Sequence, residues 1–248
     1  MVKFSYGNSC FKMEIKGEYI NKKVGGAKMN FISTRGEEGA ISSSEAIIKG
    51  IANDGGLYVP NEFPEVYDRL KKKMGLSYIE LAYEVIKEFF GDIGEENLKG
   101  AIDRAYNGKF SVREENDFLE LYHGPTSAFK DAALLFLPQI MKKAKKLNNI
   151  KEEIVILTAT SGDTGKALQG FSNVDGFKVV VYYPENGVSA IQEKQMVTQE
   201  GNNVKVIGIR GNFDNAQSGV KKIFGDVEFR EELKNRGFLL SSANSINI

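Results

Sequence analysis

The sequence has one cysteine, one histidine and no net charge, and each scarcity excludes a class of function. Because Cys10 is the single cysteine, neither a disulfide framework nor a cysteine-based metal site can form within the chain. The 33 lysine and arginine residues balance the 33 aspartate and glutamate residues, which gives no electrostatic case for nucleic-acid binding. No apolar run is long enough to span a bilayer. We therefore predict a cytoplasmic protein with no metal site, no nucleic-acid partner and no membrane segment.

The chain divides into three segments by composition and periodicity. Residues 1–28 form a lysine-rich leader that we expect to be disordered, with a small added strand pair as the alternative. Residues 29–120 are mainly helical by pattern, and serine–glutamate pairs with capping-box spacing mark helix starts at Ser42 and Ser77. In residues 121–248 the pattern changes to strands and helices in alternation.

This alternation predicts an α/β fold. Strands are predicted near 154–160, 178–183, 204–210 and 238–243, and helices near 127–146, 165–171, 188–200 and 214–225. Such a succession is typical of parallel βαβ units whose strands are buried on both faces. Pro138 should kink or split the first of these helices, because proline cannot donate the backbone hydrogen bond of a helix interior.

Lys130 is the most informative residue of the third segment. In H-G-P-T-S-A-F-K-D, residues 123–131, it lies between Phe129 and an apolar, helix-like run. Apolar surroundings should lower the pKa of a lysine amine and make its neutral form accessible. A neutral, positioned amine is what Schiff-base chemistry with a carbonyl cofactor requires. The alternative is a lysine in the first turn of an amphipathic helix, with a packed stem and its charged head in water.

A second segment has the layout of an anion-binding turn. Residues 154–160 read as a buried strand that leads through S-G-D-T-G, residues 161–165, into a short helical pattern. Such a turn can point free backbone N–H groups at an anion, assisted by the helix dipole. An ordinary strand-to-helix turn, capped by Asp163 or Thr164, explains the same residues.

Taken in order, these segments resemble threonine synthase, a pyridoxal-phosphate (PLP) enzyme of the tryptophan-synthase-β-like fold group. Three further segments carry the resemblance, namely I-S-T-R-G-E at 32–37, Y-P-E-N-G-V-S-A-I-Q-E-K-Q-M at 183–196 and S-S-A-N-S-I-N-I at 241–248. The resemblance covers residues 29–248. It implies a PLP-enzyme fold of the tryptophan synthase β type, with parallel βαβ units and a mainly helical N-terminal region.

The resemblance also implies a reaction and roles for individual residues. The family converts O-phospho-L-homoserine and water to L-threonine and phosphate. Lys130 would bind PLP as a Schiff base and then move protons, and Asn244 would donate a hydrogen bond to the 3′-oxygen of the cofactor. The substrate-binding residues would be Ser161, Gly162, Asp163 and Thr164, with Arg35 and His123 as further candidates. We expect Asp163 to face away from a bound carboxylate or to accept backbone N–H groups.

Some of these residues have equally simple structural explanations. Arg35 suits phosphate geometry, but it could instead form an exposed ion pair. His123 could pack beside the cofactor or bind an anion, and turn chemistry explains Asn244. Tyr122 and Phe129 are interpreted as packing residues.

Members of the family continue for about as long again beyond the N-S-I-N-I segment, and the part that follows carries their glycine-rich phosphate loop. We therefore expect this chain to be the N-terminal half only, a truncated form whose sheet edge is exposed and prone to self-association. The alternatives are a catalytically silent fragment or pseudoenzyme, and a lyase of the same family that acts on another phosphorylated amino acid.

Overall fold

The structure is a computed structural model, and it describes residues 3–5, 12–14, 29–73 and 75–243. Among the helices of these residues, none has both the length and the apolar character needed to cross a bilayer. Within the leader, β1 (Lys3–Ser5) pairs antiparallel with β2 (Lys12–Glu14), and the rest of residues 1–28 lies outside the described part of the chain. The expectation that the leader is disordered is therefore untested.

The N-terminal region contains the helices that its capping boxes predict. Ser42 caps α1 (Ser43–Lys49) and Ser77 caps α3 (Tyr78–Ile86), each with its side-chain oxygen accepting the backbone N–H three residues on. The other helices are α2 (Tyr67–Lys71), the 3₁₀ turn η1 (Gly91–Ile93) and α4 (Glu95–Tyr106). Because capping depends on residues three positions apart, the sequence alone predicts these two helix starts.

Short strands in the same region went unpredicted. A three-stranded antiparallel sheet combines β3 (Asn30–Ser33), β4 (Ile41–Ser42) and β5 (Tyr58–Pro60). Strands of two to four residues are too short to show the alternation that identifies a strand.

A β-hairpin follows, formed by β6 (Ser111–Glu115) and β7 (Phe118–His123). Its two-residue turn, Asn116–Asp117, has φ values of 48° and 64°, the left-handed conformation that asparagine and aspartate tolerate. The N-D dipeptide was the signal that could have identified this hairpin. Strand β7 also runs across residue 120, where the sequence placed a segment boundary.

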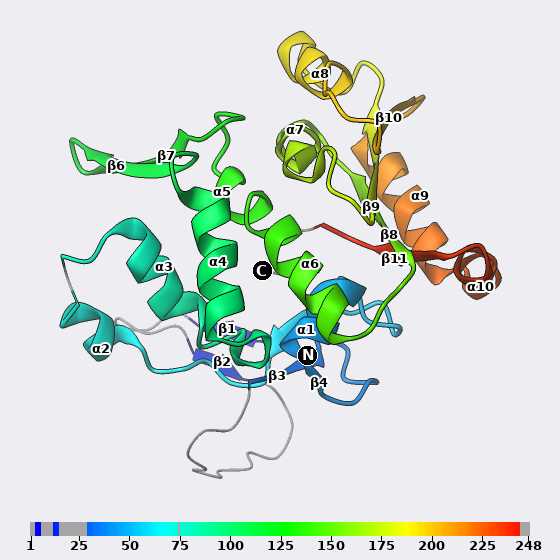
Figure 1. The fold of residues 1–248 in the computed structure, drawn as a ribbon. Coiled ribbons are helices and arrows are strands. Elements are labelled where there is room, and N and C mark those ends of the chain that lie inside the picture. Colours follow the sequence, from blue (N-terminus) through cyan, green and yellow to red (C-terminus); the bar gives the residue numbers. More distant parts are fainter. Residues whose placement is uncertain (1–2, 6–11, 15–28, 74, 244–248) are drawn as a thin grey trace.

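The predicted parallel sheet is present, with strand order β10-β9-β8-β11. Its members are β8 (Glu153–Ala159), β9 (Phe177–Pro184), β10 (Val204–Ile209) and β11 (Phe238–Ser241). Figure 1 shows this sheet from its edge, with α9 (Phe213–Gly225) and α10 (Val227–Asn235) on one side and α7 (Asp163–Ala167) on the other. Helices on both faces account for the β-branched, apolar strands.

The predicted helix near 127–146 is divided into two helices, as expected from Pro138. Helix α5 (Asp131–Leu134) ends before α6 (Leu137–Leu147), and the proline lies in the first turn of α6, where its missing N–H costs no helical bond. The other predicted helices correspond to α7 with the 3₁₀ turn η2 (Leu168–Phe171), α8 (Ala190–Val197) and α9. Helix α10 was not predicted.

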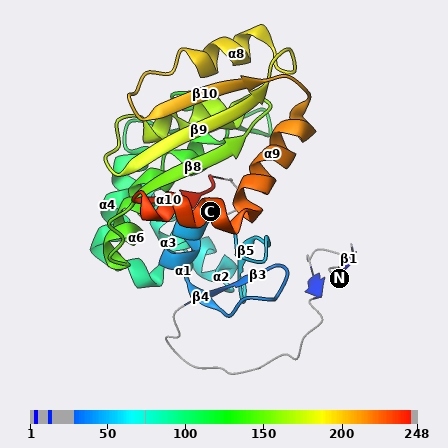
Figure 2. The ribbon, with the colours of Figure 1, turned by 90° about the vertical axis from the view of Figure 1, so that its right-hand side faces the viewer.

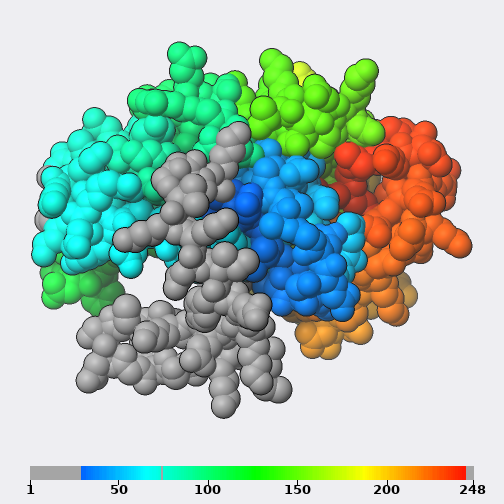
Figure 3. Space-filling model, turned by 90° about the horizontal axis from the view of Figure 1, so that it is seen from below, coloured from blue at the N-terminus to red at the C-terminus, as the bar shows by residue number. Residues whose placement is uncertain are grey.

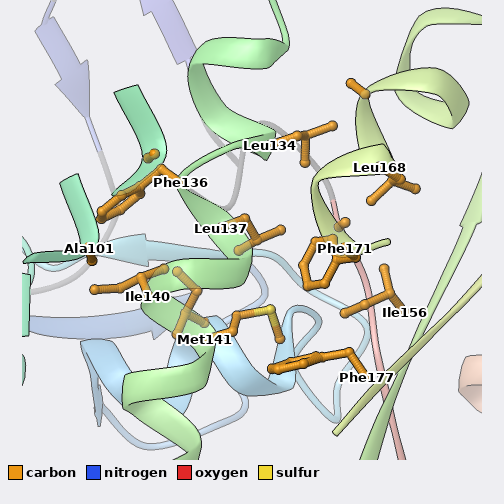
Figure 4. Close-up of a cluster of buried hydrophobic side chains, with 14 of the residues drawn as sticks. Ala101, Leu134, Phe136, Leu137, Ile140, Met141, Ile156, Leu168, Phe171 and Phe177 are labelled. Carbon is orange, nitrogen blue, oxygen red and sulfur yellow. The ribbon is translucent and has the colours of Figure 1, made fainter. Parts of the chain in front are cut away.

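The main core lies between α6 and the sheet, and it also anchors α5. Figure 4 shows Leu134 of α5 and Met141 of α6 in the same cluster as Ile156 of β8 and Phe177 of β9. These four side chains have relative exposures of 1% or less, and each contributes about 1.5–3 kcal/mol by burial. Because Leu134, the last residue of α5, is anchored in this core, this short helix is held next to the sheet. Figure 2 shows the sheet from its face, with β8 and β9 between β10 and the N-terminal region.

Candidate functional site

Lys130 immediately precedes α5, and its amine reaches the S-G-D-T-G segment. Its Nζ donates a hydrogen bond to Oγ1 of Thr164 over 2.9 Å. The same Nζ lies 5.6 Å from the ring centroid of Phe129, and the lysine as a whole is half-buried. The two motifs that the sequence singled out independently therefore meet through their polar side chains.

A buried carboxylate that sequence reasoning missed holds the loop before Lys130. Asp131 is completely buried and accepts hydrogen bonds from the backbone N–H and the hydroxyl of Thr126, at 2.9 and 2.6 Å. A Cβ atom on Gly124 would lie 2.4 Å from a carboxylate oxygen of Asp131, so only glycine leaves room for this contact. In the sequence, the acidic residue directly after the lysine was the feature that could have identified this contact. In the structure, Asp131 fixes the loop that carries Lys130.

The S-G-D-T-G loop is organised around another buried residue, Thr160. Its Oγ1 accepts the backbone N–H groups of Gly162 and Gly165, at 2.9 and 3.3 Å. Gly162 has φ 148°, and a Cβ atom there would lie 2.4 Å from the side-chain nitrogen of Gln192. The sequence predicts that backbone N–H groups of this loop are free to bind an anion. Those of Gly162 and Gly165 already donate to Thr160 within the loop.

Asp163 is exposed and begins α7. Its carboxylate accepts a hydrogen bond from Nε2 of Gln192 over 3.4 Å, and a negative charge is favourable in the first turn of a helix. Ser161 is exposed, and Gly162 is buried. The four loop residues therefore lie in one turn, and Thr164 is the member that contacts Lys130.

His123 is the last residue of β7, and its side chain contacts other residues of the hairpin. Its Nε2 lies 2.6 Å from a carboxylate oxygen of Glu120, and its ring centroid lies 4.6 Å from that of Tyr122. Tyr122 donates to the other oxygen of the same carboxylate over 2.5 Å. The hydrogen bonds from Tyr122 and His123 lower the pKa of Glu120. These contacts of His123 stabilise the end of β7, just before the lysine loop.

Arg35 lies in a different place. It lines a cavity of about 620 Å³ whose lining residues do not include Lys130 or Thr164. Its Nη1 donates to the backbone carbonyl of Asp54 over 2.6 Å. Asn244 lies outside the described residues, but Ala243, which precedes it, lines the same cavity. The structure therefore joins Lys130 to Thr164, whereas Arg35 lines a cavity whose walls include neither of these two residues.

Comparison with known proteins agrees with the resemblance of the motifs. Residues 30–106 match the model of the family described as "Threonine synthase N terminus". The threonine synthase of Schizosaccharomyces pombe is 37% identical over 242 residues, which cover 89% of this chain and 46% of the relative. The chain thus spans about half the length of the curated relatives it matches.

Solved structures show the same fold. A crystal structure of PLP-bound threonine synthase from Brucella melitensis has a TM-score of 0.74 at 36% identity, and the match covers 88% of this chain and 48% of that one. Threonine synthase from Escherichia coli gives a TM-score of 0.76 at 32% identity, covering 88% of this chain and 50% of that one. The predicted α/β fold of the PLP-enzyme type is confirmed. The chain carries the N-terminal domain of threonine synthases and is their homologue over about half of their length.

Proposed function

We propose that this chain supplies the cofactor lysine and the substrate loop of a threonine synthase-like enzyme, which converts O-phospho-L-homoserine and water to L-threonine and phosphate. The hydrogen bond between Lys130 and Thr164 carries the proposal, because it joins the two motifs whose joint presence the reaction needs. The names of the relatives and the PLP-bound state of the Brucella melitensis enzyme support the same reaction and cofactor.

The residues present fit PLP. Lys130 offers a half-buried primary amine on a loop that Asp131 fixes, and an amine is the group that attaches this cofactor covalently. Lys130 would hold the cofactor, with Asn244 donating to its 3′-oxygen. When bound, PLP withdraws electrons from the carbons of the substrate and so makes their protons removable.

The residues of the chain then position the substrate and move protons. Thr164 accepts from Nζ of Lys130 and orients that amine toward the S-G-D-T-G loop. Ser161 and Thr164 would bind the α-carboxylate of the substrate from that loop, whose shape the contact between Gly162 and Thr160 holds, while Asp163 keeps its contact with Gln192. The amine of Lys130 would accept and return protons at the α and β carbons.

The test is covalent labelling of the full 248-residue chain. Purified protein is mixed with PLP, its visible absorbance is recorded, and borohydride reduction is followed by peptide mapping. We expect a visible band whose reduced adduct maps to Lys130 and disappears in Lys130→Ala. Lys166→Ala, a substitution in neighbouring α7, is the matched control and should keep the adduct. An unchanged adduct in Lys130→Ala, or diffuse labelling of surface lysines, would contradict the assignment.

Phosphate release from O-phospho-L-homoserine then separates binding from catalysis. Release that depends on added PLP and is lost in Lys130→Ala supports the proposed reaction. A specific adduct at Lys130 without any release would instead favour a chain that binds the cofactor but is catalytically silent.

A further inference from the structure

Helix α8 is a peripheral element that packs against the S-G-D-T-G loop. Figures 1 and 2 show α8 at one end of the molecule, beside β10, while the N-terminal region lies at the other end. Figure 3 shows that other end, where the N-terminal region, in blue to cyan, and α9 and α10, in orange to red, form the surface. Met196 is the one buried residue of α8, whereas Ile191 and Val197 are 72% and 53% exposed. The face that carries Met196 is therefore the face by which this helix packs.

This face meets Gly165, the last residue of the loop. A Cβ atom on Gly165 would lie 2.5 Å from Sδ of Met196, so the thioether packs directly on the glycine. Nε2 of Gln199, just past the end of α8, donates a hydrogen bond to the backbone carbonyl of Gly165. Gln192 lies one turn before Met196 on the same face, because residues four positions apart are neighbours on a helix.

Gln192 connects the start of α8 with the loop. Its Oε1 accepts the backbone N–H and the hydroxyl of Ser189, at 3.2 and 3.0 Å, and so completes the capping box of the helix. Its Nε2 donates to Oδ1 of Asp163 over 3.4 Å, and it fills the space in which a Cβ atom of Gly162 would lie. An amide can make both contacts because it carries an acceptor and a donor. A carboxylate could complete the capping box but would repel Asp163.

The contact with Gln192 explains why a loop expected to bind a carboxylate contains an aspartate. Asp163 is exposed, and it directly precedes Thr164, whose hydroxyl accepts from Lys130. The amide of Gln192 holds the carboxylate of Asp163 toward α8. The negative charge of the loop is thus used for its attachment to this helix, and the hydroxyls of Ser161 and Thr164 are the side-chain donors that remain for a ligand.

We propose that Gln192 is a positioning residue, which holds the S-G-D-T-G loop through Asp163 so that Ser161 and Thr164 can bind the α-carboxylate of an amino-acid substrate. The nature of this ligand rests on the proposed function, whereas the anchoring of the loop by α8 does not. Since the hydrogen bonds of Gln192 end at Ser189 and Asp163 rather than at Lys130, its replacement should impair recognition of the carboxylate and leave attachment of the cofactor intact.

The first test is hydrogen–deuterium exchange of the full chain without PLP, read by mass spectrometry on peptides that cover residues 160–167. Gln192→Glu keeps the capping box but turns the contact with Asp163 into a repulsion of like charges. It should speed exchange of these peptides about fivefold, as expected for the loss of one hydrogen bond. In the double variant Gln192→Glu/Asp163→Asn, the asparagine can donate to the new carboxylate, so exchange should return to within about twofold of the unaltered chain.

The second test is recognition of the carboxylate by the PLP-loaded chain. The visible band is titrated with L-homoserine and with 3-amino-1-propanol, which has the same amine and hydroxyl groups but no carboxylate. Gln192→Glu should reduce the preference for L-homoserine about fivefold and change the affinity for the amino alcohol less than about twofold, and the double variant should recover the preference. Gln195→Glu is the matched control, because it adds the same charge to α8, and Gln195 has no hydrogen bond with the loop among the residues that the structure describes.

The outcomes separate this proposal from the proposed function. If Gln192→Glu leaves exchange unchanged, or if Gln195→Glu has the same effect, Gln192 does not position the loop. A double variant that exchanges as fast as Gln192→Glu overturns the pairing with Asp163, and faster exchange with an unchanged preference overturns the role in carboxylate binding. If exchange responds as expected but PLP does not label Lys130 of the unaltered chain, the anchoring by α8 stands and the proposed function is wrong.

Discussion

Replacing Asp131 with alanine should destabilise the chain more than any change at the surface of the site. The carboxylate is completely buried, and it accepts two hydrogen bonds from Thr126. The substitution removes both bonds and leaves the N–H and hydroxyl of Thr126 without their acceptors. It also opens the space against which Gly124 packs.

The magnitude follows from these contacts. Hydrogen bonds to a charged acceptor contribute about 1.5–3 kcal/mol each, and part of their sum is offset because a buried charge no longer has to be desolvated. We therefore expect Asp131→Ala to lower the free energy of unfolding by about 3–5 kcal/mol. Asp131→Asn keeps the shape and one acceptor oxygen, so it should cost about half as much.

The assay is urea unfolding followed by far-ultraviolet circular dichroism, at one pH for all variants. Asp163→Ala is the matched control, since Asp163 is exposed and its removal should change stability by about 0.5 kcal/mol or less. Specific PLP labelling of Lys130 should fall in the Asp131 variants, because the loop before the lysine loses its anchor. A loss of less than about 1 kcal/mol in Asp131→Ala would refute the reasoning that this carboxylate holds the loop.

Two other predictions concern backbone strain and acid stability. Gly162→Ala should lower the free energy of unfolding by about 1–3 kcal/mol, because φ is 148° at Gly162. Gly219→Ala, at an open position of α9, should raise the free energy of unfolding by about 0.5–1 kcal/mol. If the two substitutions shift the melting temperature in the same direction, this reasoning is wrong. Hydrogen bonds from Lys73 and Lys87 lower the pKa of Glu84 from 4.5 to about 2. A lowered pKa stabilises the folded state above pH 4.5, and this contribution is lost as the pH falls toward 2. In Glu84→Gln the melting temperature should therefore vary less with pH over this range. If the pH dependence of the melting temperature is the same in this variant, the ion pairs of Glu84 are not its cause.

The expected self-association stays a prediction. Among the described strands, β10 and β11 each have one neighbour and form the two edges of the parallel sheet. Unpaired strand edges can accept another strand. Sedimentation at several concentrations would measure the tendency directly.

The local features of the fold could be predicted because their causes are local. The capping boxes at Ser42 and Ser77 involve residues three positions apart, and Pro138 acts on its own helix. Buried strands could be recognised from their β-branched residues. The short strands β3, β4 and β5 could not be recognised in this way, because they are too short to show an alternating pattern. They form through pairing with one another across segments that are separated in the sequence.

The sequence by itself determined the chemistry available to this protein: a lysine beside an apolar helix, a glycine-containing turn after a buried strand, and motifs that resemble one family. Only the tertiary structure decided which of these groups meet. Lys130 and Thr164 are 34 positions apart, and packing of α5 and α6 against the sheet brings them into contact. Arg35 shares a cavity with Lys221 and Arg230. Contacts between distant residues depend on how whole elements pack, which no local pattern encodes.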